Sequence, residues 1–309
     1  MTHETTKAGL RAVATGILTP FDDDLAVDHA ALAANARAIA DAGIGTVLAC
    51  ANVSEYHSLS HEERVAVTET SVEALPTDVT VLAGAGGSTK TTIDLASAYA
   101  ALGVDAIMVM PPMHTYKHER GLLSYYRQIG DAVEVPLVPY LRGFDPSVEF
   151  VADLTRLESV SGVKWTIPDV PKFARSVRAG ADDVVWMNGL GEPYAIPLHM
   201  EGAEGQSSGI GNFEPVVGLA LDEALDAGDL ERAREIRDAA LPFMAFREEA
   251  GEDNAIPNAN SVPALKAGLE FAGLTGGPVR EPLVDLSDAE YERARTLYDD
   301  LAAFIDAEL

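Results

Sequence analysis

The chain has 309 residues, and its 22 lysines and arginines against 49 aspartates and glutamates give a formal net charge of −27. Hydrophobic residues make up 47% of it, enough to fill a large core, which excludes disorder, a collagen-like repeat and a small disulfide scaffold. The acidity argues against a nucleic-acid partner, because phosphate binding requires a basic face.

The acidic residues are spread along the whole chain. Such a surface predicts a halophilic protein, with ordinary acidic solubility as the alternative. Cys50 is the only cysteine, so an internal disulfide is impossible and no oxidising compartment is required. Residues 1–11 lack the apolar stretch of a signal peptide and no 18-residue apolar run follows. We therefore expect a cytoplasmic protein without a membrane partner.

Short β-branched or apolar runs recur along the first two thirds of the chain, at intervals typical of repeated βα units around a parallel sheet. Each run is short enough to be one strand. The eight predicted strands are 13–18, 46–50, 79–84, 106–110, 137–141, 160–165, 184–188 and 205–209.

Helical patterns separate these strands. Asp28 is placed to cap the first, and Ser60-x-x-Glu63 is a capping box before the second. A glycine-rich stretch at 84–91 resembles a phosphate loop but has Thr89 where that loop needs glycine, so it predicts a turn into a capped helix. Strands and helices together predict a (β/α)8 TIM barrel over residues 1–215. The predicted connecting helices are 28–42, 61–74, 91–102, 120–132 and 170–179.

Helical patterns continue beyond the last predicted strand, and no linker or low-complexity tract precedes them. We expect a C-terminal helical extension over residues 216–309 that packs on the barrel, covering an edge or building a subunit contact. Its predicted helices are 215–227, 229–246, 262–272 and 288–309.

Catalytic residues of such a barrel lie at the carboxyl ends of the strands. Lys164 lies in an apolar stretch near the end of the sixth strand, and Tyr140 ends the fifth. A buried lysine loses part of its positive charge and becomes a nucleophile for a carbonyl carbon, and a neighbouring phenol can relay protons. The alternative for Lys164 is a solvated strand-end lysine paired to a carboxylate. The remaining lysines, at 7, 90, 117, 172 and 266, all have solvated interpretations.

Two further features follow predicted strands. The turn at 51–55 combines small polar side chains with free backbone N–H groups, which could bind a carboxylate. The histidine pairs 57/61 and 114/118 have the i,i+4 spacing of a helical metal pair. Neither pair has an HExxH context and both lie in loop-like sequence, which favours surface histidines and no metal.

Several short motifs occur in a characteristic order and spacing that covers nearly the whole chain. Together they resemble the dihydrodipicolinate synthase/N-acetylneuraminate lyase family of class I, Schiff-base barrels. The motifs are Thr19-Pro20-Phe21, Asn52–Glu55, Ser58–Arg64, Ala83–Gly86, Tyr140, Gly162-Val163-Lys164, Gly205–Pro215 and Gly276–Leu283.

The resemblance implies roles for particular residues. Lys164 would form the imine, Tyr140 would relay protons, and no cofactor beyond the covalent lysine imine would be needed. His114 stands where one branch has a second relay tyrosine from a neighbouring subunit, and the family implies a homo-oligomer, a tetramer. The residues assigned to substrate binding are Asn52, Val53, Ser54, Glu55, Arg142, Ser207, Ser208 and His114.

One departure narrows the expected activity. Asp145 stands where the synthase branch has an aldehyde-binding arginine, which disfavours lysine biosynthesis. The segments 55–60 and 140–142 resemble the sugar-acid dehydratase branch instead. We expect a 2-keto-3-deoxy-pentonate dehydratase giving 2-oxoglutarate semialdehyde from a small-molecule 2-oxo acid. The alternatives are a 2-keto-3-deoxygluconate-type aldolase that releases pyruvate, a non-catalytic sugar-acid-binding protein and a metal-dependent lyase.

Overall fold

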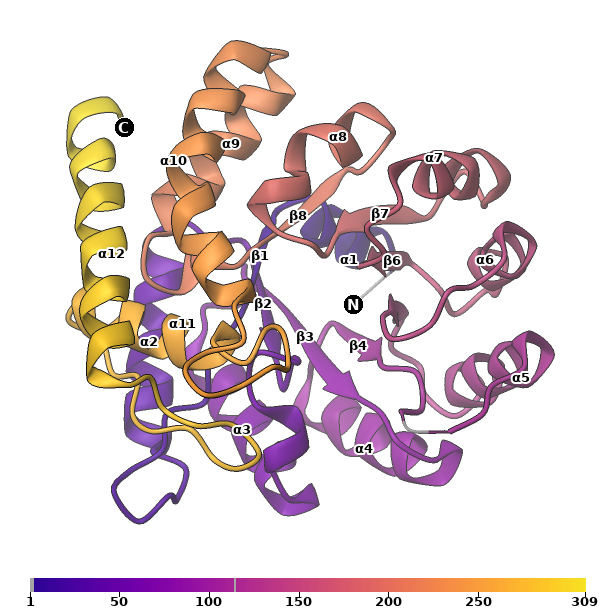
Figure 1. Cartoon of the computed structure of the whole chain (residues 1–309). Coiled ribbons are helices and arrows are strands. Elements are labelled where there is room, and N and C mark those ends of the chain that lie inside the picture. The colour runs from indigo at the N-terminus through magenta and orange to yellow at the C-terminus, as the bar shows by residue number, and fades with distance from the viewer. Residues whose placement is uncertain (1–2, 114) are drawn as a thin grey trace.

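A computed structural model describes residues 3–113 and 115–309, and its sheet is a closed parallel barrel in the order β1 to β8 (Figure 1). Every strand overlaps the range predicted for it, and the TIM-barrel prediction is confirmed. The strands are β1 (Val13–Gly16), β2 (Thr46–Ala49), β3 (Thr80–Ala85), β4 (Ala106–Val109), β5 (Leu137–Leu141), β6 (Gly162–Trp165), β7 (Val185–Asn188) and β8 (Gly205–Ser208).

Helices surround the barrel, and three of the α-helices described were not predicted. These are α1 (His3–Leu10), α6 (Val148–Thr155) and α8 (Ala195–Met200), each of eight residues or fewer. The helices that were predicted are α2 (His29–Asp41), α3 (His61–Ala74), α4 (Thr89–Leu102), α5 (Glu119–Gly130), α7 (Val170–Ala179), α9 (Pro215–Asp226), α10 (Leu230–Glu248), α11 (Ser261–Phe271) and α12 (Asp288–Glu308).

The predicted helix starts are correct because their caps form. The Asp28 carboxylate accepts a hydrogen bond from the amide of Ala31 at 2.9 Å, and Ser60 and Glu63 form the reciprocal capping box of α3. At the glycine-rich stretch, Ser88 Oγ accepts from the amide of Thr91 at 3.2 Å and begins α4. The stretch is therefore a strand-to-helix turn, as predicted.

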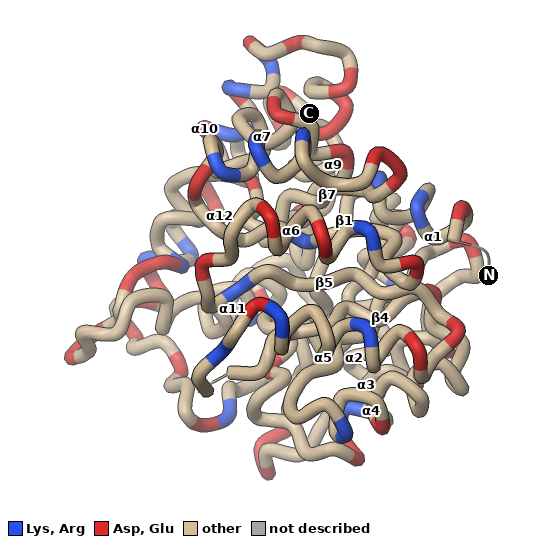
Figure 2. Tube along the Cα trace, turned by 90° about the vertical axis from the view of Figure 1, so that its right-hand side faces the viewer, with Lys and Arg blue, Asp and Glu red and all other residues tan. Residues whose placement is uncertain are grey.

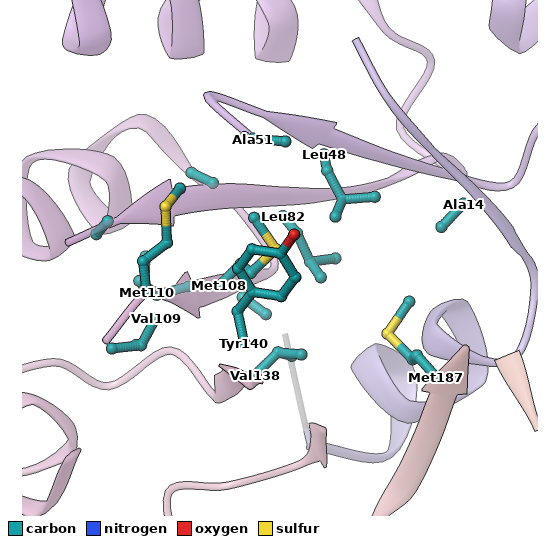
Figure 3. Close-up of a cluster of buried hydrophobic side chains, with 14 of the residues drawn as sticks. Ala14, Leu48, Ala51, Leu82, Met108, Val109, Met110, Val138, Tyr140 and Met187 are labelled. Carbon is teal, nitrogen blue, oxygen red and sulfur yellow. The ribbon is translucent and has the colours of Figure 1, made fainter. Parts of the chain in front are cut away.

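The barrel interior is filled by apolar side chains from alternating strand positions. Figure 3 shows the ring of Tyr140 among Leu82, Met108 and Val138, with Met187 nearby. Every strand residue is buried, as expected for a parallel sheet covered by helices outside and side chains inside. This packed interior leaves the strand ends as the place for a site.

The C-terminal helices form a second apolar core against one side of the barrel. Helix α9 packs on β8 and β1, and α10, α11 and α12 contact one another around Phe213, Phe243 and Leu265 (Figure 1). The helices α10 and α11 thereby reach the carboxyl ends of the strands. The division of the chain at residue 215 stays a proposal.

Charged residues lie mainly on the outer helices and loops, where acidic and basic positions are interspersed (Figure 2). The lysine nearest the N-terminus differs from its predicted solvated state. Lys7 lies in α1, is 7% exposed and pairs with Asp183 at 3.2 Å. Across residues 3–113 and 115–309, each helix is too short or too polar to span a bilayer.

Candidate functional site

A cavity of about 370 Å³ lies at the carboxyl ends of the strands, where a barrel of this kind places its chemistry. Its wall is built from the turn after β2, the ends of β5 and β6, and the loops that follow β7 and β8. Side chains from α10 and α11 and the segment 282–283 close it from the C-terminal side. The C-terminal helices are therefore part of the site.

Lys164 projects from β6 into this cavity and is 7% exposed. Burial, and to a smaller degree the positive charge of Arg142, lowers the pKa of Lys164 from 10.5 to about 7. Within the described residues, no carboxylate lies within 4.0 Å of its Nζ. The side chain is therefore a buried amine that is about half uncharged at pH 7, and the alternative of a solvated, paired lysine is wrong.

Tyr140 lies beside Lys164 because the two residues are direct partners in the register of β5 and β6. The Lys164 Nζ is 5.1 Å from the centre of the Tyr140 ring, and both side chains line the cavity. Arg142 Nη1 donates to the phenol oxygen at 3.3 Å. The phenol thus has the lysine on one side and a guanidinium at its oxygen, an arrangement suited to moving a proton.

Some side chains of the turn after β2 point into the cavity, and others point into the protein interior. Asn52 and Val53 line the cavity. Ser54 does not, because its hydroxyl is fully buried, donates to the Ile17 carbonyl and accepts from the amide of Ala51 at 3.0 Å. Its role is to hold the turn, so the structure does not bring the predicted Ser54 side chain to a substrate.

Glu55 ends this turn in a left-handed backbone conformation with φ of 56°. Its carboxylate pairs with Lys266 at 2.7 Å, and both side chains are buried. It also accepts from the amide of Arg280 at 2.9 Å. Lys266 therefore does not have its predicted solvated environment, and Glu55 fastens the carboxylate-binding turn to α11 and the C-terminal segment.

The end of β8 supplies both predicted serines. Ser207 and Ser208 line the cavity. The Ser208 hydroxyl donates to Glu192 at 2.5 Å, and the amide of Gly209 donates to the same carboxylate at 3.2 Å. The Ser207 hydroxyl has no hydrogen-bond partner among the described residues. Ser207 therefore has an unused hydrogen-bonding hydroxyl, buried at the cavity wall, whereas the Ser208 hydroxyl is bound to a buried carboxylate.

Sequence reasoning missed three residues of the site. Glu192 is fully buried under Ser208, and Arg247 reaches the cavity from α10 with 8% exposure. Asn212 also lines the cavity, and its amide donates to the Gly16 carbonyl at 3.0 Å. Asn212 belongs to a motif noted in the sequence, but no sequence signal distinguishes Arg247 from the surface arginines of the same helix.

The structure describes three of the four histidines in the two predicted pairs, and it separates the first pair. His57 lies in the short helical turn η1 (Tyr56–Ser58), while His61 begins α3, so the two do not share one helix face. His118 caps α5 by accepting from the amide of Arg120 at 3.2 Å, and His114 lies outside the described residues. In the part of the chain that the structure describes, no cluster of three or more histidine, cysteine or carboxylate side chains could hold a metal.

Known proteins match nearly the whole length of this chain. Residues 9–300 match the dihydrodipicolinate synthetase family. A 4-hydroxy-tetrahydrodipicolinate synthase from Methanothrix thermoacetophila is 28% identical over 92% of this chain and 95% of its own. A probable 5-dehydro-4-deoxyglucarate dehydratase from Acinetobacter baumannii is also 28% identical, over 93% of this chain and 92% of its own.

A similar structure has been solved. The crystal structure of dihydrodipicolinate synthase from Oceanobacillus iheyensis superposes with a TM-score of 0.90 at 26% identity, and the match covers 99% of this chain and 100% of that one. The shared architecture thus extends over the barrel and the C-terminal helices that close the cavity.

Proposed function

Because this chain belongs to the dihydrodipicolinate synthetase family, we propose that it is a Schiff-base lyase that removes water from a 2-keto-3-deoxy sugar acid. The observation that carries the proposal is a buried Lys164 amine, with its pKa lowered to about 7, in register with Tyr140 and lining the same cavity. A ketone held there meets a nucleophile and a proton relay at once.

The reaction begins with the neutral amine. With a pKa of about 7, roughly half of the Lys164 side chains are unprotonated at pH 7, against about one in three thousand at the ordinary value of 10.5. Its lone pair adds to C-2 of the substrate. Tyr140 carries a proton to the resulting hydroxyl, which leaves as water, and the product is a protonated imine.

The imine then acts as the electron sink for elimination. Loss of a C-3 proton moves the C–H electron pair into an enamine, and the enamine expels the C-4 hydroxyl, which takes up a proton and leaves as water. For a pentonate, transfer of a C-5 proton to C-3 through the enol then turns C-5 into an aldehyde, and hydrolysis of the imine releases the product and returns the Lys164 amine. Asn52, Val53 and the backbone of their turn would hold the C-1 carboxylate, and the Ser207 hydroxyl would face the sugar chain.

Two observations favour a sugar acid over the synthase reaction of other family members. Asp145 stands where the resemblance implies an arginine in the synthase branch, and Lys172 Nζ already donates to it, so this position offers no cation to an aldehyde substrate. The relative from Acinetobacter baumannii is itself named a probable sugar-acid dehydratase. The pentonate predicted from the sequence is the first substrate to assay, and a homotetramer adapted to high salt stays a prediction.

Borohydride trapping tests the imine. Reduction in the presence of a 2-keto-3-deoxy acid should add the mass of the acid to the peptide that contains Lys164. Lys164→Ala should abolish the adduct, while the control Lys90→Ala, at an exposed position of α4, should leave it unchanged. An adduct elsewhere, or none with any 2-oxo acid, would overturn the proposal.

Product analysis separates water loss from carbon–carbon cleavage. We expect the dehydrated 2-oxo acid, which carries an aldehyde when the substrate is a pentonate, in stoichiometric yield and no pyruvate. Pyruvate in stoichiometric yield would instead establish the aldolase alternative, which uses the same imine but deprotonates the C-4 hydroxyl. Binding without either product would establish a non-catalytic sugar-acid-binding protein.

A further inference from the structure

Arg247 is a buried cation that the imine chemistry does not use. It lies in the last turn of α10, is 8% exposed and lines the cavity. Its guanidinium crosses the carboxyl end of β8 at Gly209, where an added Cβ would lie 2.0 Å from Arg247 Nη1. A side chain at position 209 would displace the guanidinium, so the end of β8 is shaped to admit it.

The guanidinium of Arg247 has more N–H donors than hydrogen-bond acceptors around it. Nη1 donates to the Met244 sulfur and Nη2 to the Ser261 hydroxyl, each at 3.2 Å, while Nε has no partner among the described residues. Within those residues no carboxylate lies within 4.0 Å of the guanidinium. A guanidinium has five N–H donors in a planar fork that matches a carboxylate, and a buried one without such a partner is costly.

The charges that line the cavity also favour an anionic ligand. Lys164, Arg142 and Arg247 all line it, and Arg142 is close enough to act on the titration of both others. Two carboxylates belong to the wall, and the one at Glu55 is neutralised by Lys266. The other, Glu248, and the buried Glu192 act on Arg247 only through space, because neither forms an ion pair with it within 4.0 Å. Among the described residues, the cations that line the cavity therefore have no direct carboxylate partner.

We propose that Arg247 binds a second carboxylate at the far end of the substrate, so that the enzyme acts on a dicarboxylic 2-oxo-3-deoxy sugar acid. This inference rests on the proposed function and selects the substrate class within it. A pentonate ends in a neutral hydroxymethyl group, which leaves the Arg247 fork without an anion. A six-carbon diacid presents two oxygens that can accept from the fork in parallel.

The dimensions of the barrel are compatible with such a chain. Lys164 is on β6 and the guanidinium lies at the end of β8, two strand spacings away, which is about 10 Å between strand axes. The Lys164 stem and the substrate's carbon chain together cover that distance. The opposite end of the diacid would lie at the turn after β2, which lines the same cavity.

The test compares 2-oxoadipate with 2-oxohexanoate, which have the same length and differ only at the far end. The readout is the concentration of each acid that half-saturates borohydride trapping at Lys164, measured by mass spectrometry. We expect the wild-type protein to be half-saturated at a concentration of 2-oxoadipate about tenfold lower than that of 2-oxohexanoate, because only 2-oxoadipate can make the additional charge-assisted contact. Arg247→Leu should lose the preference without changing the trapping of pyruvate, and Arg247→Lys should keep part of it.

The control is Arg234→Leu, an exposed arginine of the same helix, which should retain the full preference. Equal half-saturation of the two acids in the wild-type protein would overturn the assignment, as would a preference that survives Arg247→Leu. If Arg247→Leu does not fold, the wild-type comparison and Arg247→Lys decide alone. Failure to trap pyruvate at Lys164 in any variant would refute the proposed function itself, so the two failures are distinguishable.

Discussion

Replacement of Lys164 by methionine should abolish imine formation and, at neutral pH, make the protein more stable. The side chain is 7% exposed, and burial holds its pKa at about 7 against an ordinary value of 10.5. Folding therefore requires the amine to leave water and give up its proton. Methionine has a similar length, carries no charge and packs readily in irregular apolar spaces, so it removes this cost.

The magnitude follows from the pKa difference. Each pKa unit corresponds to about 1.4 kcal/mol, so the fall from 10.5 to about 7 represents about 5 kcal/mol at and below pH 7. Lost contacts of the lysine stem will reduce the gain. We expect Lys164→Met to raise the free energy of unfolding at pH 7 by about 2 to 5 kcal/mol.

The dependence on pH separates this effect from ordinary repacking. Between pH 7 and 10.5 the unfolded wild-type chain binds a proton at position 164 that the native protein does not, so the wild-type protein gains stability as pH rises. The variant has no such group. Its advantage should thus be largest at pH 7, shrink through pH 9 and nearly vanish by pH 10.5.

Urea unfolding at pH 7, 8.5 and 10, at one protein concentration, measures this difference. Lys90→Met, at an exposed position of α4, is the matched control and should follow the wild-type curve. A Lys164→Met variant that is less stable than wild type at pH 7, or whose advantage is constant with pH, would refute the argument that the lysine is buried without its proton.

Three other substitutions or probes report on the surroundings of the site. Tyr140→Phe should lower kcat by about a hundredfold or more while borohydride still traps Lys164, and unchanged turnover would remove the phenol from the mechanism. Lys266→Met should destabilise the fold by about 3 to 5 kcal/mol in thermal unfolding because it leaves the Glu55 carboxylate buried and unpaired, and Glu55→Gln in the same chain should restore most of the loss. Burial raises the pKa of Cys50 to about 11, so a thiol reagent at pH 8 should modify it only after unfolding; rapid labelling of the native protein would contradict its burial.

The barrel could be predicted because local sequence and tertiary structure agree in most of its units. Runs such as 106–110 and 137–141 are apolar throughout, as expected for strands buried on both faces, and caps such as Ser60 mark helix starts. The missed helices α6 and α8 are too short for a periodic pattern to rise above the surrounding loop sequence. Their stability comes from packing on the barrel.

The two central residues of the site were predictable for a similar reason. Tyr140 and Lys164 lie near the ends of consecutive strands, and consecutive strands of this barrel are neighbours, so sequence order alone brings them together. Glu55 and Lys266 are 211 positions apart, and Lys266 lies on a helix that is buried on every side, so neither spacing nor amphipathicity points to their ion pair. Only the docking of α11 on the barrel creates it.

The overall acidity of the chain and the cationic lining of its cavity arise from different parts of the fold. The acidic residues lie mainly on outer helices and loops (Figure 2), whereas Lys164 and Arg247 are buried at the cavity. At 0.1 M salt the field of exposed charges falls off within about 10 Å, while buried charges in a low-dielectric cavity are screened far less. A net charge of −27 therefore sets how the molecule behaves toward solvent and other macromolecules, and it does not oppose the binding of a small anion beside a few desolvated cations.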